Sequence, residues 1–127
     1  MERKNLILGS ILISLFTLLG FYLETQLGAG AEWQNSTRHH MWKTAHLHGN
    51  LFGVLNIIYG LLIFYLKKPA DSFLKTGGLL AFTGGILFPF ALFMGGVIPQ
   101  LVYLAPIGGL CMIVSWFLLS FTLIRNK

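Results

Sequence analysis

Residues 44–66 read TAHLHGNLFGVLNIIYGLLIFYL, an apolar run that contains no Asp, Glu, Lys or Arg. A helix of about 20 residues, rising ~1.5 Å per residue, crosses the ~30 Å hydrocarbon core of a bilayer. Three further stretches have the same character: Asn5–Leu23, Gly77–Ile98 and Leu101–Ile124. The sequence therefore predicts an all-α integral membrane protein, a single domain of residues 1–127 with four transmembrane helices in an antiparallel bundle.

The composition supports this interpretation. Of the 127 residues, 55% are hydrophobic and only 10% are charged, which is more apolar surface than a soluble domain of this length can bury. The net charge is +5, but the basic residues flank apolar runs instead of forming one face, which argues against nucleic acid as a partner. The single cysteine, Cys111, lies inside an apolar run, so it forms no intrachain disulfide and is expected to serve packing.

The first apolar run has an alternative interpretation. Arg3 and Lys4 precede it and the small residues 28–31 follow it, as in a cleaved signal peptide. The run is longer than the usual core of a signal peptide, however. We therefore expect it to be retained as the first transmembrane helix.

The distribution of basic residues predicts the orientation. The predicted outer loop, residues 24–43, holds only Arg38 and Lys43, offset by Glu24 and Glu32. The other basic residues all belong to the opposite side: Arg3, Lys4, Lys67, Lys68, Lys75, Arg125 and Lys127. Because cytoplasmic loops carry the excess of Lys and Arg, both termini are expected in the cytoplasm, with the protein in a bacterial inner (cytoplasmic) membrane.

Small residues mark the expected contacts between helices. In lipid, helices associate through close backbone approach and a few polar contacts, because burial of Leu against Leu gains little there. Pro89 and Pro106 are expected to kink the third and fourth spans. The candidate packing residues are Gly49, Gly53, Asn56 and Gly60 in the second span, Gly84 and Gly85 in the third, and Gly108 and Gly109 in the fourth.

All four histidines, His39, His40, His46 and His48, fall within ten residues at the outer mouth of the second span. Ionisable groups at such positions are costly and often functional. Imidazole is also a common ligand of haem iron, copper and zinc. The four histidines are therefore candidate metal ligands, and His46 and His48 are candidate haem ligands.

The helix geometry separates His46 from His48, since residues two apart point about 200° from one another. His46 is expected to face the bundle near Gly49 and Asn50, while His48 shares a face with Phe52 and Leu55. Met94, near the outer end of the third span at a comparable depth, is the candidate second ligand of a His/Met haem, and a histidine-rich copper site is the other cofactor hypothesis. The alternative is that the histidines are interfacial residues that hydrogen-bond to water, lipid phosphate or a neighbouring helix.

The chain resembles a known family in several short motifs: Leu19-Gly20, His46 at the mouth of span two, Gly84-Gly85-Ile86-Leu87-Phe88, and Pro106-Ile-Gly108-Gly109 with Trp116. The family is that of small four-span membrane proteins of unknown function that includes bacterial YgdD and human transmembrane protein 256. The resemblance implies a four-span bundle and brings no established activity. His48-Gly-Asn-Leu also resembles the start of the helix that supplies a low-spin haem ligand in subunit I of nitric oxide reductases and haem-copper oxidases. That resemblance implies His48 as an axial ligand.

Three hypotheses follow. The first is a non-enzymatic accessory or scaffold protein that is a homo-oligomer or a subunit of a larger membrane complex. The second is a haem- or metal-binding protein that uses His46 or His48 near the outer face. The third is a small transporter or lipid-binding protein with a cavity framed by Pro89 and Pro106. No nucleotide-binding loop, catalytic triad or pair of catalytic carboxylates is evident in the sequence, which favours a protein that is not an enzyme.

Overall fold

A computed structural model describes residues 1–66 and 71–125. Its elements are α1 (Glu2–Thr25), α2 (Ala31–Gln34), α3 (Thr37–Leu66), α4 (Ser72–Gly95), the 3₁₀ helix η1 (Pro99–Leu104) and α5 (Ala105–Arg125). Four segments, α1, α3, α4 and η1 with α5, are long and apolar enough to cross a membrane. The all-α bundle of four membrane-length helices is thus confirmed.

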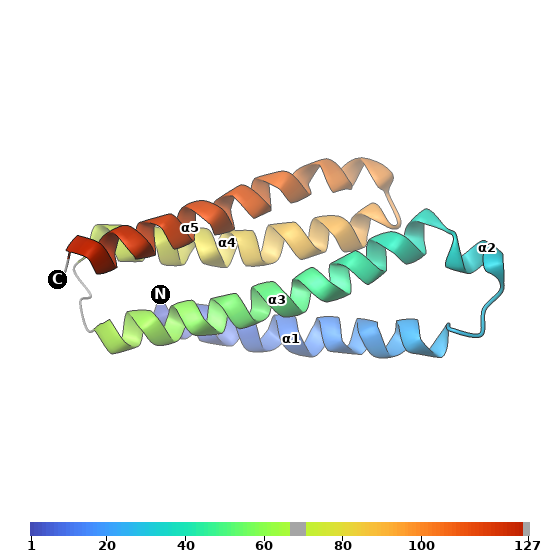
Figure 1. The fold of residues 1–127 in the computed structure, drawn as a ribbon, viewed down its shortest axis with the longest axis horizontal. Helices are drawn as coiled ribbons and strands as arrows, with labels where there is room; N and C mark the ends of the chain where they lie inside the picture. Colours follow the sequence, from blue (N-terminus) through green and yellow to red (C-terminus); the bar gives the residue numbers. More distant parts are fainter. Residues whose placement is uncertain (67–70, 126–127) are drawn as a thin grey trace.

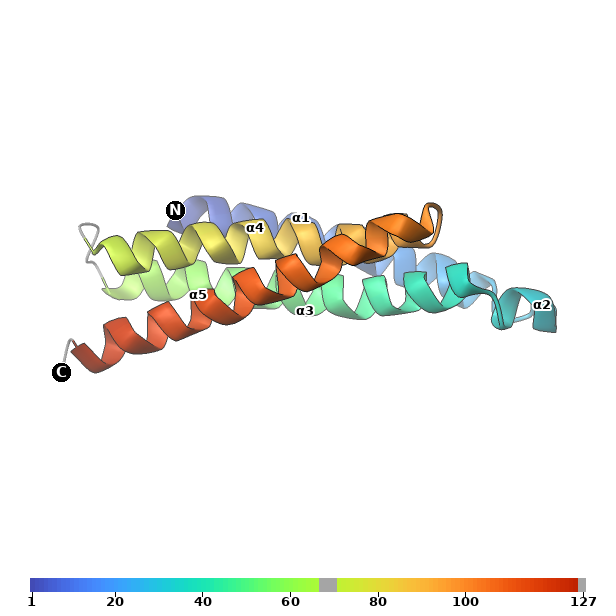
Figure 2. The ribbon, with the colours of Figure 1, turned by 90° about the horizontal axis from the view of Figure 1, so that it is seen from above.

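The helices lie side by side in the order α1, α3, α4, α5, with α3 and α4 in the middle (Figure 1). Both termini lie at one end of the bundle, and α2 lies at the other. Within the described part of the chain, the backbone of α5 closely approaches α4 and η1 but neither α1 nor α3. Figure 2 shows α5 running obliquely across α4. The backbones of α3 and α5 therefore stay apart, and side chains such as Tyr59 and Trp116 meet between them with ring centroids 5.9 Å apart.

The closest backbone contacts depend on glycine. A Cβ atom on Gly9 of α1 would lie 2.5 Å from the carbonyl oxygen of Gly53 of α3. A Cβ atom on Gly108 of α5 would lie 2.5 Å from the backbone nitrogen of Phe88 in α4. No side chain fits at these crossings, so the two outer helices reach the central pair only because glycine is present.

The second transmembrane helix begins earlier than the sequence predicts. The loop expected over residues 24–43 ends at Ser36, and α3 begins at Thr37 instead of Thr44. The Ser36 hydroxyl accepts a hydrogen bond from the backbone N–H of His39 at 3.1 Å, which caps the helix. The residues that follow are polar, so hydropathy gave no sign of the helix there. His39 and His40 consequently lie on a helix and not in a loop.

The ends of α4 and α5 also differ from the expected spans. The Asp71 carboxylate accepts the backbone N–H groups of Phe73 and Leu74, so α4 starts at Ser72, before the predicted Gly77. Pro89 is fully buried within α4. Pro106 lies in the first turn of α5, where its missing N–H costs nothing, so the kink expected within the fourth span is replaced by a junction between η1 and α5.

The described residues agree with the charge pattern used for the orientation. Arg3, Lys4, Lys75 and Arg125 all belong to the end of the bundle that holds the termini. Lys67, Lys68 and Lys127 lie outside the described residues. Which end faces the cytoplasm stays a prediction from the positive-inside rule.

Candidate functional site

His46 is held between α1 and α3. Its Nδ1 lies 2.5 Å from the carbonyl oxygen of Phe16, and its ring occupies the space that a side chain at Gly20 would fill. Because a carbonyl oxygen only accepts, Nδ1 donates its hydrogen to it. In the neutral form of the ring this leaves the lone pair on Nε2.

Polar side chains on both helices surround His46. The amide of Asn50 donates to the His46 carbonyl oxygen at 3.0 Å, and its nitrogen lies 3.2 Å from His46 Nδ1. The hydroxyl of Thr17 donates to Asn50 Oδ1 at 3.0 Å. These bonds fix the outer halves of α1 and α3 against each other around the imidazole.

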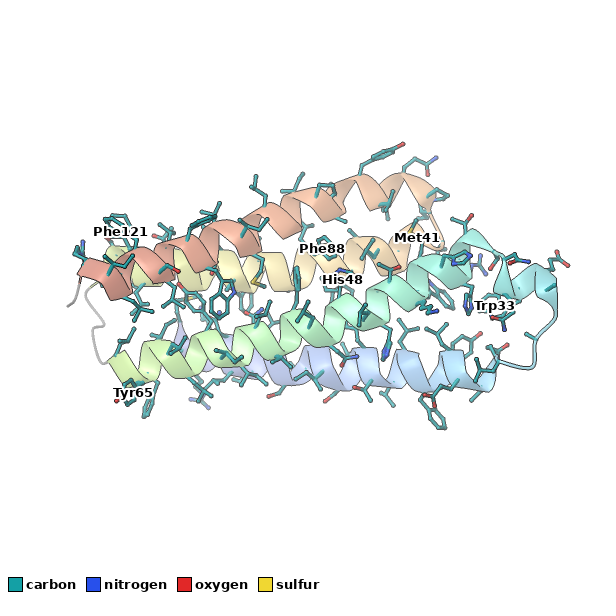
Figure 3. The ribbon with its side chains drawn as sticks, in the orientation of Figure 1. Trp33, Met41, His48, Tyr65, Phe88 and Phe121 are labelled. Atoms are coloured by element: carbon teal, nitrogen blue, oxygen red, sulfur yellow. The ribbon has the colours of Figure 1, made fainter. Side chains whose placement is uncertain are left out.

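His48 faces the opposite neighbour, α4. Its Nδ1 lies 3.0 Å from the carbonyl oxygen of Thr44, and its ring centroid lies 5.0 Å from that of Phe88 and 6.3 Å from that of Phe52. Figure 3 shows His48 and Phe88 facing one another between α3 and α4. His46 and His48 therefore serve two different interfaces, as their two-residue spacing requires.

The remaining histidines lie at the start of α3. His39 is only 9% exposed, its ring packs edge-on against Trp33 at 5.6 Å, and its Nδ1 is buried without a hydrogen-bond partner. His40 is exposed, with its ring 5.8 Å from that of His39. From His39 to His48 the helix rises about 14 Å, so the cluster in the sequence is spread along the structure.

The structure does not bring the predicted ligands together. Among residues 1–66 and 71–125, no group of three or more His, Cys, Asp or Glu side chains is placed to hold a metal ion. Met94 is not at the depth of His48, because His48 packs on Phe88 and Met94 lies about 9 Å further along α4 toward its outer end. Cys111 is half-buried, with its Cβ 3.3 Å from the position of a Cβ on Gly84.

A cavity of ≈250 Å³ lies where α1 ends and α3 begins, at the end of the bundle away from the termini, which the positive-inside rule predicts to face outward. We call it the outer cavity. It contains both the half-buried His46 and the buried His39, and it is lined by Gly20, Leu23, Glu24, Leu27, Gln34, His39, Lys43 and His46.

The outer cavity contains charges of both signs. Glu24 and Lys43 both line it, and neither belongs to an ion pair within the described part of the chain. Gln34 donates to the carbonyl oxygen of Gln26 at 2.9 Å, which holds α2 beside the end of α1. The cavity thus combines an acid, a base and two imidazoles with the apolar side chains of Leu23 and Leu27. Glu24 and Lys43 are both exposed to its opening.

The sequence did not single out Glu24, Lys43 and Gln34. The available signal was the spacing of His39, Lys43 and His46, which are four and three residues apart and so share one helix face. That signal appears only once α3 is known to begin at Thr37. Treating residues 24–43 as a loop concealed it.

The candidate packing residues lie at contacts between helices. A Cβ on Gly84 would lie 2.6 Å from the carbonyl oxygen of Gly108. A Cβ on Gly85 would collide with the side-chain amide of Asn56 in α3. A Cβ on Gly49 would meet Phe16, and one on Gly60 would lie 2.8 Å from the carbonyl oxygen of Glu2. The last two positions, Gly53 and Gly109, face Gly9 and Phe88 respectively.

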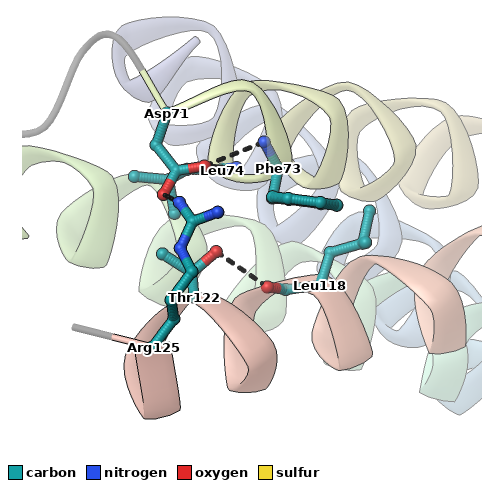
Figure 4. A network of polar contacts seen from close by, with 6 residues as sticks. All are labelled: Asp71, Phe73, Leu74, Leu118, Thr122 and Arg125. Carbon is teal, nitrogen blue, oxygen red and sulfur yellow. Dashed lines mark hydrogen bonds and ion pairs between the residues drawn. The ribbon is translucent and has the colours of Figure 1, made fainter. Parts of the chain in front are cut away.

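A second polar cluster lies at the opposite end of the bundle and has a structural role. Arg125 forms an ion pair with Asp71 at 2.8 Å, and Asp71 also caps α4 through Phe73 and Leu74 (Figure 4). The Thr122 hydroxyl donates to the Leu118 carbonyl oxygen nearby. These contacts join the end of α5 to the start of α4, and both carboxylate oxygens of Asp71 are engaged. Comparison with family models, curated proteins and solved structures finds no match to this chain.

Proposed function

We propose that this chain is a non-enzymatic accessory protein of a bacterial inner membrane, with cytoplasmic termini, and that it binds phospholipid in the outer cavity. The observation that carries the proposal is the position of Glu24 and Lys43 in a cavity at the end of α1. The 24 residues of α1 extend about 36 Å, which exceeds the ~30 Å hydrocarbon core. α1 is therefore long enough for its last turn to reach the layer of lipid headgroups.

The walls of the cavity suit a phospholipid. The Lys43 ammonium offers charge-assisted hydrogen bonds to phosphate oxygens, and long basic side chains near helix ends extend into the headgroup layer. Leu23 and Leu27 supply apolar surface for the start of the acyl chains. These features favour lipid binding among the functions considered for a non-enzymatic protein of this size.

Reversing the charge of Lys43 tests this function. We expect protein purified in mild detergent to retain phospholipid, and Lys43→Glu to weaken retention about tenfold or more through lost phosphate contacts. Phosphorus analysis of the purified protein measures the bound lipid. Lys75→Glu, an exposed lysine at the other end of the bundle, is the matched control and should retain it. Equal retention by Lys43→Glu and the unchanged protein would contradict the proposal.

The open groove between α3 and α5 favours a second role, self-association. It has a volume of ≈470 Å³ and is lined by Leu55, Met112, Ile113, Trp116, Phe117 and Ser120. Ile113 and Phe117 are also prominently exposed on α5, so one face offers both a ridge and a groove. An interface between two identical copies requires a self-complementary face of this kind. The occupant that we propose is a second copy of the chain.

A pair of phenylalanine substitutions tests self-association. Phe117 is 71% exposed on α5 and Phe21 is 67% exposed on α1, so truncating either leaves the interior intact. We expect Phe117→Ala to weaken dimerisation about tenfold, the loss of one buried aromatic contact, and Phe21→Ala to leave it unchanged. Energy transfer between labelled chains in liposomes measures the association. A monomeric wild-type protein, or equal effects of the two variants, would refute this role.

A further inference from the structure

We infer that the outer cavity selects a zwitterionic group in which a primary ammonium and a phosphate are joined by a short linker, as in the phosphoethanolamine headgroup of a phospholipid. This inference rests on the proposed lipid binding and adds the identity of the headgroup. It depends on how charges, helix ends and unpaired nitrogen atoms are arranged around the cavity.

The helix ends give the cavity a built-in polarity. α1 ends at Thr25 and α3 begins at Thr37, so the cavity lies between a helix C-terminus and a helix N-terminus. The first carries partial negative charge and the second partial positive charge. Glu24 stands at the negative end, while Lys43 lies on α3. Glu24, in the last turn of α1, thus has the same sign as its helix end, while Lys43 lies in the second turn of α3, beyond the reach of the helix-end charge. A ligand with two opposite charges can pair its ammonium with Glu24 and its phosphate with Lys43.

The imidazoles add selectivity for N–H donors. The Nδ1 hydrogen of His46 is committed to the Phe16 carbonyl oxygen, so in the neutral imidazole Nε2 is the acceptor. Glu24 likewise only accepts when ionised. A primary ammonium donates up to three hydrogen bonds to such acceptors, whereas the quaternary ammonium of choline has no N–H. His39, buried and with its Nδ1 unpaired, completes the polar wall on the α3 side.

The volume of the cavity admits a headgroup but not a whole lipid. A cavity of ≈250 Å³ has room for about eight water-sized groups, at ~30 Å³ each. A phosphoethanolamine group can be accommodated in this space, whereas a whole phospholipid or a haem is far larger. The acyl chains would therefore lie outside the cavity, along the apolar surfaces of α1 and α3.

The test is a competition among headgroups. The full-length protein is reconstituted in nanodiscs with equal amounts of phosphatidylethanolamine, phosphatidylcholine and phosphatidylglycerol, and the lipid retained after extraction into detergent is identified by mass spectrometry. We expect phosphatidylethanolamine to be enriched about tenfold over the other two lipids, the effect of one charge-assisted hydrogen bond. Glu24→Gln should abolish the preference for phosphatidylethanolamine over phosphatidylcholine while lipid is still retained. Glu32→Gln, which alters a glutamate outside the cavity, should keep the preference.

The outcomes separate the inference from the proposed function. Lipid retained without preference, or a preference that survives Glu24→Gln, overturns the headgroup assignment and leaves lipid binding intact. No retained lipid of any kind overturns both. A last arm adds free phosphoethanolamine to the detergent-solubilised protein. Displacement of the lipid only at large excess supports the lipid as the natural ligand, whereas tight binding of the free compound by protein that shows no enrichment of lipid assigns the site to a soluble ligand and overturns the lipid source.

Discussion

Replacing Gly108 by alanine is expected to lower the free energy of unfolding by about 3 kcal/mol, the upper part of the range for overpacked sites. The new Cβ would lie 2.5 Å from the backbone nitrogen of Phe88 and 2.9 Å from its Cα. Backbone atoms inside a helix cannot move aside as a side chain can, so α5 must shift away from α4. Among the described residues, the backbone of α5 closely approaches only α4 and η1. A shift away from α4 therefore loosens the packing of the whole helix.

The adjacent glycine supplies the control. A Cβ on Gly109 would meet only the ring of Phe88, at 3.2 and 3.3 Å, and a ring edge can give by a few tenths of an ångström. Alanine also gains about 1 kcal/mol of helix propensity over glycine at either position. Gly109→Ala should therefore stay within about 1 kcal/mol of the wild type. Unfolding in mixed micelles with increasing SDS, followed by tryptophan fluorescence, measures both variants, and equal losses would show that the backbone contact is unimportant.

The sequence predicts the bundle well because the bilayer limits the possible structures. An apolar run of membrane length has to be a helix, since every backbone polar group must be satisfied within it. The four spans follow from that constraint, and the glycine positions follow from the need for close approach between helices in lipid. Neither argument requires knowledge of which helix neighbours which. The neighbours themselves, such as Gly9 against Gly53, emerge only from the structure.

The outer cavity could not be predicted, because its parts come from segments that hydropathy treats as loop. α3 continues through the polar residues Arg38 to Lys43 because Ser36 caps it and because Trp42 stacks on Phe93 and donates to its carbonyl oxygen at 3.0 Å. These are tertiary contacts with α4. A hydropathy average over the sequence contains no information about them.

The histidines show the same limit. Their density in the sequence indicated a metal or haem site, but density along a helix is not proximity to one point in space. His46 and His48 each bind a carbonyl oxygen, of Phe16 and Thr44 respectively, and their rings pack against different helices. The number of histidines is therefore a poor guide to whether their side chains converge on one ligand. The two-residue spacing of His46 and His48, in contrast, correctly predicts that they face different helices.

A buried pair of asparagines carries the second large expected effect. Asn5, Asn56 and the carbonyl oxygens of Gly78 and Ala81 form a network that joins α1, α3 and α4, and both asparagine side chains are 0% exposed. The Asn5 amide donates to Asn56 Oδ1 at 3.1 Å and to the Gly78 carbonyl oxygen at 3.0 Å. The Asn56 amide donates to the Ala81 carbonyl oxygen at 3.1 Å. No other polar side-chain contact found in the described residues links three of the membrane-length helices.

We expect Asn56→Leu to cost about 2 kcal/mol, because it removes the acceptor of one Asn5 N–H and leaves Asn5 as a buried amide with Gly78 as its remaining partner. Asn5 Oδ1 is already buried without a partner, so the single variant strands most of a polar group where no water reaches it. The double variant Asn5→Leu/Asn56→Leu removes both amides, and replacing both partners of a buried hydrogen bond by apolar groups is often nearly neutral. It should therefore be more stable than Asn56→Leu alone, within about 1 kcal/mol of the wild type. If the double variant instead loses the sum of the two single losses in the same SDS titration, the asparagines contribute independently and the hydrogen bond between them adds no stability of its own.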